Sequence, residues 1–551
     1  MAPRFTLFML LAGILVLTTH IAGLTGGELL YNGIELPDQW PPRIEQLTRE
    51  PMPVPYLEHR PAVVPINIGR QLFVDDFLVE ECSLQRTFHT ADFHPINPIL
   101  TFDKSWEKRG KSPVAYPYSG GAWYDFRDKL FKIWYSGQLD PPGIYGARIH
   151  CLAHSKDGVH WEKPVLDIEP GTNIVLRQYH DGGTVWLDEN TTDPSQRYKL
   201  FGVDVSNGVR LTLFYSADGI HWRDSGASGR QLGDRTTCFY NPFRKVWVVG
   251  VRIGGTVGRA RAYVEDANPE TLVGKLGTAT PWCGADKLDP HNPRPEFQHI
   301  EPQLYNLDVV AYESLMLGLF AIWQGPGNQE VAKLGIQKRC DLLVGFSRDG
   351  FHWHRPDRRR FLAGTDQKGD WNFGNIQSAG GCCLVVGDKL YFYVSGREED
   401  ASGWHGRSST GLAVLRRDGF TSLDASPSGG SVTTRPVTFQ GQHLRVNVDC
   451  PEGKLLVEVL DEKGNVIPPL TEENCIPVTG NSTNAQVQWN GASDLSAIAG
   501  IPVRFRFSLT NGSLYSFWVS ADSNGASHGY VSAGGPGFRG VVDLPHFNTS
   551  D

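Results

Sequence analysis

The sequence predicts an all-β protein, a five-bladed β-propeller followed by a C-terminal β-sandwich. Three observations predict it. The phrase Ser-x-Asp-Gly-x-His-Trp occurs at 155–161, 216–222 and 347–353. An incomplete copy that keeps the Asp-Gly pair, called the worn copy below, lies at 416–420. The Asp residues of the four copies are 61, 131 and 69 residues apart, which leaves room for one lost copy. Helical periodicity with caps is scarce, and a repeat of this length is typical of a propeller or a similar array.

The repeated phrase is expected to build the fold and not to carry chemistry. Asp-Gly between alternating apolar segments marks a tight turn, because Gly accepts a positive φ and the Asp carboxylate can bind turn amides. The Trp that follows supplies a large apolar surface for packing against a neighbour. We assign His160, His221 and His352, which lie inside the phrase, to packing as well.

The chain has 551 residues, too many for a single core. An apolar run at 5–17 behind Arg4 predicts a signal peptide over 1–23, and therefore a secreted or periplasmic protein. Residues 24–110 are predicted to form an extended, Pro-rich arm and a strand at 71–80 that closes the array or covers an edge. Asp75 and Asp76 would point to opposite faces of that strand, which favours a structural role over a catalytic pair.

Five units of strands then follow over 111–426, one for each predicted blade. The composition changes after them: 427–431 (PSGGS) predicts a linker, and short alternating strands over 432–545 predict the β-sandwich. Cys450 and Cys475 lie in this second domain and could form a disulfide after export. The oligomeric state is left open.

The composition excludes some partners. The formal net charge is −8, and a mildly acidic surface argues against binding to nucleic acid or to an anionic membrane. The nine Cys residues are scattered without metal-site spacing. The expected partner is a carbohydrate, for the reasons that follow.

In a propeller, the first strand of each blade lines the central axis, so the residue that opens this strand faces the binding site. The five openings are Tyr118-Ser119, His180-Asp181, Asp234-Arg235, Glu301, and Asn375 with Gln377. Three consecutive blades therefore offer a carboxylate. Cleavage of a glycosidic bond uses a carboxylic acid to protonate the leaving oxygen and a second carboxylate as base or nucleophile. We predict Glu301 as the acid, Asp181 as the base or nucleophile, and Asp234 as the stabiliser.

Five blades, carboxylates in the order Asp, Asp, Glu and a C-terminal β-sandwich resemble glycoside hydrolase families 32, 43, 62 and 68. The resemblance covers most of the chain and implies removal of furanosyl or related sugars. It departs from those families at the first blade, where Tyr118-Ser119 replaces the usual Asp. The family 32 signatures Asn-Asp-Pro-Asn-Gly and Glu-Cys are absent, and Gly233-Asp234-Arg235 only loosely echoes Arg-Asp-Pro.

Other polar residues are candidates for substrate binding at the rim. Arg252 and Arg397 end second strands, and Trp404-His405 lies in a Gly-rich loop where it could stack on a sugar ring. The full set of predicted binding residues is Tyr118, His180, Arg235, Arg252, Gln377, Arg397, Trp404 and His405. No cofactor is indicated, although a metal such as calcium is conceivable where His180, Asp181 and Asp234 meet.

The sequence thus predicts a secreted glycoside hydrolase that removes terminal sugars from a polysaccharide or oligosaccharide. Two alternatives remain open. A glycoside phosphorylase would need basic side chains at the axis, for which Arg235, Arg252 and Arg397 are available. A non-catalytic carbohydrate-binding protein could also have kept the fold. The sugar, the linkage and the stereochemical course are not specified by the sequence.

Overall fold

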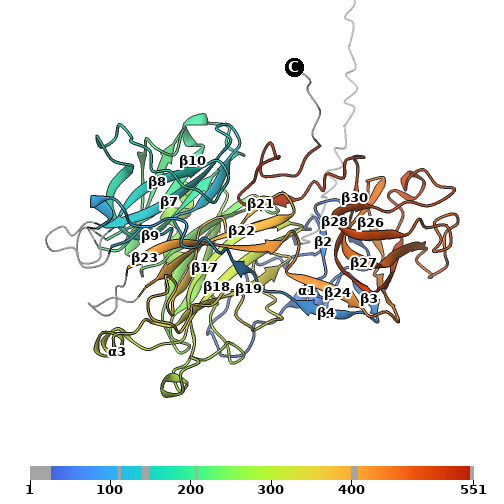
Figure 1. The fold of residues 1–551 in the computed structure, drawn as a ribbon, viewed down its shortest axis with the longest axis horizontal. Helices are drawn as coiled ribbons and strands as arrows, with labels where there is room; N and C mark the ends of the chain where they lie inside the picture. The colour runs from blue at the N-terminus through green and yellow to red at the C-terminus, as the bar shows by residue number, and fades with distance from the viewer. Residues whose placement is uncertain are drawn as a thin grey trace, which may run out of the picture.

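The computed structural model describes residues 27–108, 113–138, 148–205, 208–231, 233–398 and 407–545. Strands dominate, and the strand pairing divides the protein into a propeller and a second β domain, which lie side by side (Figure 1). The predicted signal peptide at 1–23 lies outside the described residues. No helix within the described ranges is long and apolar enough to span a bilayer.

The propeller has the five predicted blades, each an antiparallel sheet. Blade one consists of β6 (Ala122–Asp125), β7 (Leu130–Gln138), β8 (Arg148–Ser155) and the first half of β9 (Ile174–Leu187). Blade two consists of the second half of β9, β10 (Tyr198–Asp204), β11 (Arg210–Ser216) and β12 (Arg223–Gln231). Blade three consists of β13 (Thr237–Asn241), β14 (Val246–Ile253), β15 (Ala260–Asp266) and β16 (Thr280–Cys283).

The last two blades recruit strands from the ends of the chain. Blade four consists of β17 (Gln303–Glu313), β18 (Leu315–Trp323), β19 (Cys340–Ser347) and, beside β17, the C-terminal β31 (Tyr530–Val531). Blade five consists of β20 (Ile376–Ser378), β21 (Leu384–Val386), β22 (Lys389–Arg397), β23 (Ser408–Arg416) and the N-terminal β5 (Asp92–Phe93).

The strand that completes blade five is therefore β5 and not the predicted strand at 71–80. That segment is two short strands, β2 (Gln71–Leu72) and β3 (Val79–Cys82), which join the second domain. Asp75 lies in the turn between them, where it is buried and accepts hydrogen bonds from Arg348 at 2.8 and 2.9 Å. The structural role predicted for Asp75 is confirmed.

The Asp-Gly phrases form closely similar turns. In the copy of blade four, the Asp349 carboxylate accepts hydrogen bonds from the backbone N–H of Phe351 at 2.9 Å and of His352 at 2.8 Å. The His352 ring lies 2.7 Å from the same carboxylate, and Gly350 has φ 83°. The copies at Asp157 and Asp218 repeat these contacts. The structural role predicted for the Asp residues is confirmed. The packing role predicted for the His residues is wrong for His160 and His221, whose side chains are 73% and 55% exposed and bind the turn carboxylates instead.

Each of these turns is tied to the preceding blade by an aromatic hydrogen-bond donor. Trp134 of blade one donates its indole N–H to the Gly219 carbonyl of blade two at 2.8 Å. Trp282 of blade three donates to the Phe351 carbonyl of blade four at 2.8 Å. Tyr393 of blade five closes the circle by donating to the Gly158 carbonyl of blade one at 2.7 Å. The repeat therefore joins neighbouring blades.

Blade three is the blade with the lost copy. Its third strand is followed by α2 (Pro269–Gly274), and the side chain of the N-cap residue Asn268 accepts from the Thr271 N–H. The worn copy in blade five keeps Asp418, which is fully buried and accepts a hydrogen bond from the Tyr312 hydroxyl of blade four at 2.5 Å. Blades four and five are thus also linked by a hydrogen bond, but here the acceptor is the Asp418 carboxylate and not a backbone carbonyl.

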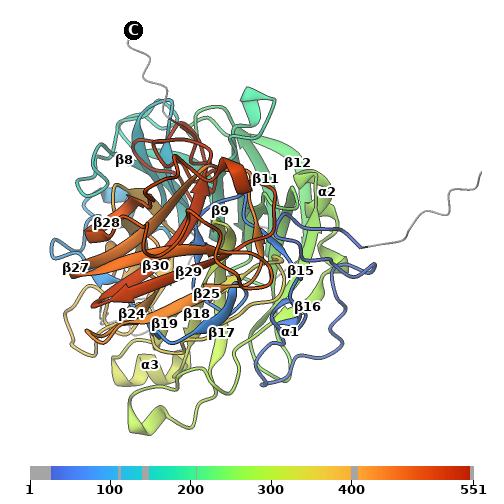
Figure 2. The ribbon, with the colours of Figure 1, turned by 90° about the vertical axis from the view of Figure 1, so that its right-hand side faces the viewer.

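The second domain contains an antiparallel sheet of nine described strands that bends around β27 (His443–Leu460). A parallel pair, β1 (Val64–Pro65) and β26 (Val437–Thr438), lies outside this sheet. Residues 443–449 of β27 pair with β30 (Gly512–Ser520), whereas 454–460 pair with β29 (Arg504–Thr510). The sheet covers one side of the propeller (Figure 2). Its remaining strands are β2, β3, β4 (Gln85–Phe88), β24 (Thr421–Ala425), β25 (Gly430–Thr434) and β28 (Val478–Gln486).

Two details of the second domain differ from the prediction. The segment 427–431 comprises part of the turn between β24 and β25 and the first two residues of β25. It is not a linker, since both strands belong to the same sheet. Cys450 and Cys475 are free and buried. The Cys450 thiol lies 3.5 Å from the Val478 carbonyl and the Cys475 sulfur accepts the Val457 N–H at 3.2 Å, so the two sulfurs have separate partners.

The turn contacts predict a graded loss of stability. The side chain of Asp349 is 4% exposed and that of Asp157 is 54% exposed. Asp349→Ala leaves buried amides without an acceptor, which costs about 1–3 kcal/mol, and the exposed turn can use water instead. The midpoint of thermal unfolding should fall clearly for Asp349→Ala and little for the matched variant Asp157→Ala. Equal shifts would contradict the proposed role of burial.

Candidate functional site

The ends of the inner strands meet at Tyr118 and Ser119, which precede β6. Both residues have left-handed backbone conformations, with φ of 47° and 68°. The Tyr118 N–H donates to Ser395 of blade five at 2.9 Å. This turn carries the carbonyl of Tyr118 and the hydroxyl of Ser119 to the axis, where side chains from other blades bind them.

Arg235 is the buried centre of this region. Its guanidinium donates to the Tyr118 carbonyl at 2.7 Å and to the Ser119 hydroxyl at 3.1 Å, and it lies 3.5 Å from the Tyr118 ring centroid. Arg235 has a left-handed backbone with φ 60°, and Arg261 donates to its carbonyl at 2.5 Å. Gly182 lets the guanidinium approach β9, since a Cβ there would lie 3.1 Å from its Nη1.

Asp234 is the carboxylate at the exposed edge of the region. It forms ion pairs with Arg252 and, at 3.0 Å, with Arg259. The side chains of Asp234 and Arg252 are 29% and 37% exposed, so both reach solvent. Gly233 makes this pairing possible, because a Cβ at that position would lie 2.5 Å from Cδ of Arg252. Asp234 is thus held in place and open to a ligand.

Tyr305 enters the same region from blade four. The pairing of β17 with β18 shifts register between Leu304 and Asn306, and this bulge leaves Tyr305 without a cross-strand partner. The Arg259 guanidinium lies 3.9 Å from the Tyr305 ring centroid, and Arg261 donates to the Tyr305 carbonyl. Burial alone would raise the pKa of Tyr305, but nearby Arg259, Lys338 and Arg397 outweigh it and lower the pKa.

Three further cations surround these residues. Burial lowers the pKa of Lys338, and the charges of Arg397 and Arg259 act in the same direction. Arg148 and Arg397 lie 5.5 and 5.7 Å from the Tyr118 ring centroid. We call this set the axial cluster; its members are Tyr118, Arg148, Asp234, Arg235, Arg252, Arg259, Tyr305, Lys338 and Arg397.

A buried polar network links blades one, four and five next to the axial cluster. Asp308 accepts hydrogen bonds from the hydroxyls of Ser119 at 3.1 Å and Ser378 at 2.5 Å, and from the Asn306 amide at 2.8 Å. Burial raises the pKa of Asp308, although its hydrogen bonds and Arg235 oppose the shift. Because Ser119 also binds Arg235, the network positions the centre of the cluster.

The structure brings together several of the predicted site residues, whereas another forms its ion pair with the N-terminal arm. Tyr118, Asp234, Arg235, Arg252 and Arg397 all belong to the axial cluster. Gln377 is buried in β20 and donates to Asn375 at 3.0 Å. Glu301 is the exception. Its side chain is 57% exposed and pairs at 3.3 Å with Arg49 of the N-terminal arm, whereas the ion pairs of Asp234 with described residues are with Arg252 and Arg259.

The side chains of four predicted site residues lie outside the described part of the structure. His180 and Asp181 belong to β9, and His180 is paired in register with Arg148 and Asp204, but their side chains lie outside the described part of the structure. The residue that follows Asp181, Gly182, lies against Arg235. Trp404 and His405 lie outside the described residues altogether. The predicted roles of these four residues stay predictions.

Sequence reasoning missed Arg148, Arg259, Tyr305 and Lys338. The rule that the first residue of a blade faces the axis selected Glu301, but the bulge in β17 places Tyr305 there. Arg259 follows the tip of the β14–β15 hairpin, and Lys338 precedes β19 after a loop that contains α3 (Asn328–Leu334). A basic residue at a hairpin tip does not indicate a binding site in a single sequence, because most such residues are exposed to solvent.

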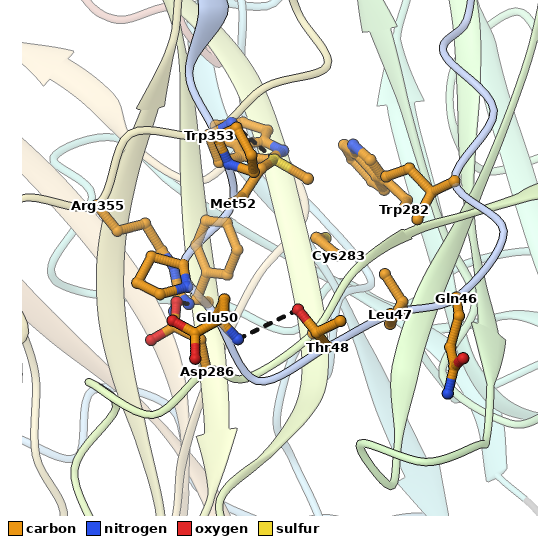
Figure 3. Close-up of a pocket in the computed structure, with 15 residues that line it drawn as sticks. Gln46, Leu47, Thr48, Glu50, Met52, Trp282, Cys283, Asp286, Trp353 and Arg355 are labelled. Atoms are coloured by element: carbon orange, nitrogen blue, oxygen red, sulfur yellow. Dashed lines mark hydrogen bonds and ion pairs between the residues drawn. The ribbon is translucent and has the colours of Figure 1, made fainter.

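A separate pocket of about 330 Å³ lies between the N-terminal arm and blades three and four (Figure 3). Arm residues 44–53 form one wall, and Trp282, Phe320 and Trp353 contribute aromatic rings. Figure 3 shows Met52 beside Trp353, with Trp282 across the pocket. None of the predicted site residues lines it. Among the described residues, no group of three or more His, Cys, Asp or Glu could hold a metal ion.

Comparison with solved structures finds glycoside hydrolases and glycoside phosphorylases. A glycosyl hydrolase from Bacteroides ovatus aligns at 11% identity with a TM-score of 0.39, over 60% of this chain and 94% of that one. A β-1,2-mannobiose phosphorylase from Listeria innocua aligns at 13% identity and 0.39, over 59% and 96%. A GH32 β-fructofuranosidase from Bombyx mori aligns at 10% identity and 0.33, over 78% and 95%. No family model and no curated protein sequence matches the chain.

The buried network yields a test. Because the pKa of Asp308 is raised, its carboxyl group binds a proton more tightly in the folded protein than in the unfolded chain. The free energy of unfolding therefore decreases as pH rises toward the pKa of the folded state. Asp308→Asn removes that decrease, whereas Asp308→Ala leaves buried donors unpaired at a cost of about 1–3 kcal/mol. Relative to wild type, the thermal midpoint of the Asn variant should therefore improve between pH 4 and pH 7. An Asn variant as unstable as the Ala variant would contradict this.

Proposed function

We propose that this protein cleaves glycosidic bonds at the axial cluster and recognises a negatively charged group there. The observation that carries the proposal is Asp234, a solvent-reaching carboxylate held by two guanidinium groups among further cations. A carboxylate beside a sugar ring can act as base, or stabilise the positive charge that develops at the anomeric carbon. The surrounding cations raise the local concentration of anions and orient them.

Hydrolysis of an anionic glycan is the version we favour. Asp181 and Asp234 open neighbouring blades, and the backbone beside Asp181 adjoins Arg235. Two carboxylates would then face one substrate, one as base or nucleophile and the other to stabilise the positive charge at the anomeric carbon. The narrow axis of a five-bladed propeller favours removal of terminal sugars. We keep export of the protein as part of the proposal, on the strength of the apolar segment at 5–17.

Phosphorolysis is the second candidate, and the excess of cations favours it. Arg259 lies near both Tyr305 and Cys340. Lys338 adds its charge near Tyr305, and Arg235 adds its charge near Cys340. Free phosphate brings its own charge as nucleophile, so one protein carboxylate would suffice for the reaction. A requirement for inorganic phosphate separates the two candidates.

The test is a screen of aryl glycosides and of neutral, uronic-acid-containing and sulfated polysaccharides, each with and without inorganic phosphate. We expect turnover of an anionic substrate, or phosphate dependence. Asp234→Asn should then lose at least about 100-fold in rate, because a positioned proton-transfer or charge-stabilising group is removed.

Arg252→Ala should lose more activity on an anionic substrate than on its neutral analogue, and added salt should reduce that difference. Arg127→Ala is the matched control, since Arg127 lies on the hairpin turn between β6 and β7 and its side chain is 61% exposed. Binding of sugars without turnover by the wild type would favour the non-catalytic alternative. Equal losses for Arg252→Ala and Arg127→Ala would contradict the proposed site.

A further inference from the structure

We infer that Tyr305 donates the proton to the leaving oxygen when the glycosidic bond breaks. The inference rests on the proposed function and assigns its acid. Bond cleavage needs a proton donor, and the acid predicted from sequence, Glu301, pairs with Arg49 of the N-terminal arm. The axial cluster instead contains the phenol of Tyr305, which comes from blade four, the blade that was expected to supply the carboxylic acid.

The local geometry presents the phenol to a ligand. The bulge in β17 turns Tyr305 out of the regular strand pairing, and bulges commonly re-aim a side chain next to an active site. Tyr305 is half-buried, and its hydroxyl makes no hydrogen bond with any described residue. The hydroxyl is not enclosed by protein atoms, so it reaches solvent. The phenol is thus available to a substrate.

The backbone and ring of Tyr305 are fixed even though its hydroxyl is free. Arg261 donates to its carbonyl, and Arg259 covers its ring at 3.9 Å while pairing with Asp234 at 3.0 Å. Arg259 therefore joins the proposed proton donor to the carboxylate. A donor and a carboxylate held by one guanidinium keep a constant relative position, which proton transfer requires.

The charges around Tyr305 favour loss of its proton. The groups that face it are Arg259 after the β14–β15 hairpin, Lys338 before β19, Arg397 at the end of β22, and Asp234 before β13. Three cations outweigh one carboxylate, and burial only partly opposes them, so the pKa lies below that of an ordinary tyrosine. A general acid works best when its pKa approaches the working pH, because it then gives up its proton readily.

In the proposed hydrolysis, the phenolic proton of Tyr305 passes to the glycosidic oxygen. This oxygen keeps the electron pair of its broken bond to the anomeric carbon. A water oxygen bonds to that carbon and gives a proton to the Asp234 carboxylate. The phenolate is stabilised by Arg259, Lys338 and Arg397 until solvent carries the proton from Asp234 back to it. No further reactant is needed.

The first experiment does not depend on turnover. The ultraviolet difference spectrum between wild type and Tyr305→Phe during an alkaline titration reports ionisation of Tyr305 alone. We expect a midpoint below the ordinary value of about 10. Tyr391→Phe is the matched control: Tyr391 is half-buried on β22, and burial raises its pKa. A Tyr305 midpoint at or above about 10 would overturn the inference.

The second experiment uses the glycosides that the screen identifies. Tyr305→Phe should slow cleavage of an alkyl glycoside by about 10²–10⁴-fold, because an alkoxide cannot leave without protonation. Cleavage of the 4-nitrophenyl glycoside should fall less than about 10-fold, since nitrophenolate leaves without protonation. In the variant, the decrease in rate at alkaline pH that follows ionisation of Tyr305 should be absent. Equal losses on both substrates would reject Tyr305 as the acid. If no glycoside is cleaved by wild type, the proposed function fails while the titration still reports on Tyr305.

Discussion

The structure depends on hydrogen bonds between an aromatic donor of one blade and an Asp-Gly turn of the next. Such bonds link blade one to blade two, blade three to blade four, and blade five to blade one. Each turn can offer its carbonyl because the Asp carboxylate already satisfies its amides and Gly supplies the positive φ. The repeat therefore ties neighbouring blades to one another.

A fixed axis allows the protein to hold like charges together. Arg235 and Arg261 are buried, and neighbouring cations make such burial costly unless each guanidinium is hydrogen-bonded. Both donate to backbone carbonyls, Arg235 to Tyr118 and Arg261 to Arg235 and Tyr305. Backbone carbonyls supply partial negative charge without adding carboxylates. Asp234 is consequently the carboxylate that the described part of the cluster presents to solvent, and an anionic ligand would complete the charge balance.

The second domain is attached through the last copy of the repeat. Asp418 accepts from Tyr312 of blade four, and it also pairs with Arg70 at 3.0 Å and accepts from Ser516 of β30 at 2.7 Å. Burial opposes the ionisation of Asp418, but Arg70 and Arg417 outweigh it and lower the pKa to about 2. The same carboxylate thus serves the propeller and the sheet beside it. The N-terminal strands β2, β3 and β4 run in that sheet as well, which ties both ends of the chain to one framework.

The sequence by itself determined the number of blades and the structural role of the Asp-Gly phrases. It also selected five residues that the structure brings into one cluster: Tyr118, Asp234, Arg235, Arg252 and Arg397. These follow from local rules: turn chemistry and strand alternation act over a few residues and repeat in each unit. Only the tertiary structure decided that β5 closes blade five, that the segment 427–431 lies within a sheet, and that Glu301 pairs with Arg49. It also decided that Tyr305 joins the axial cluster, because one extra residue in β17 shifts the strand's phase and strand pairing between distant segments cannot be seen in local pattern.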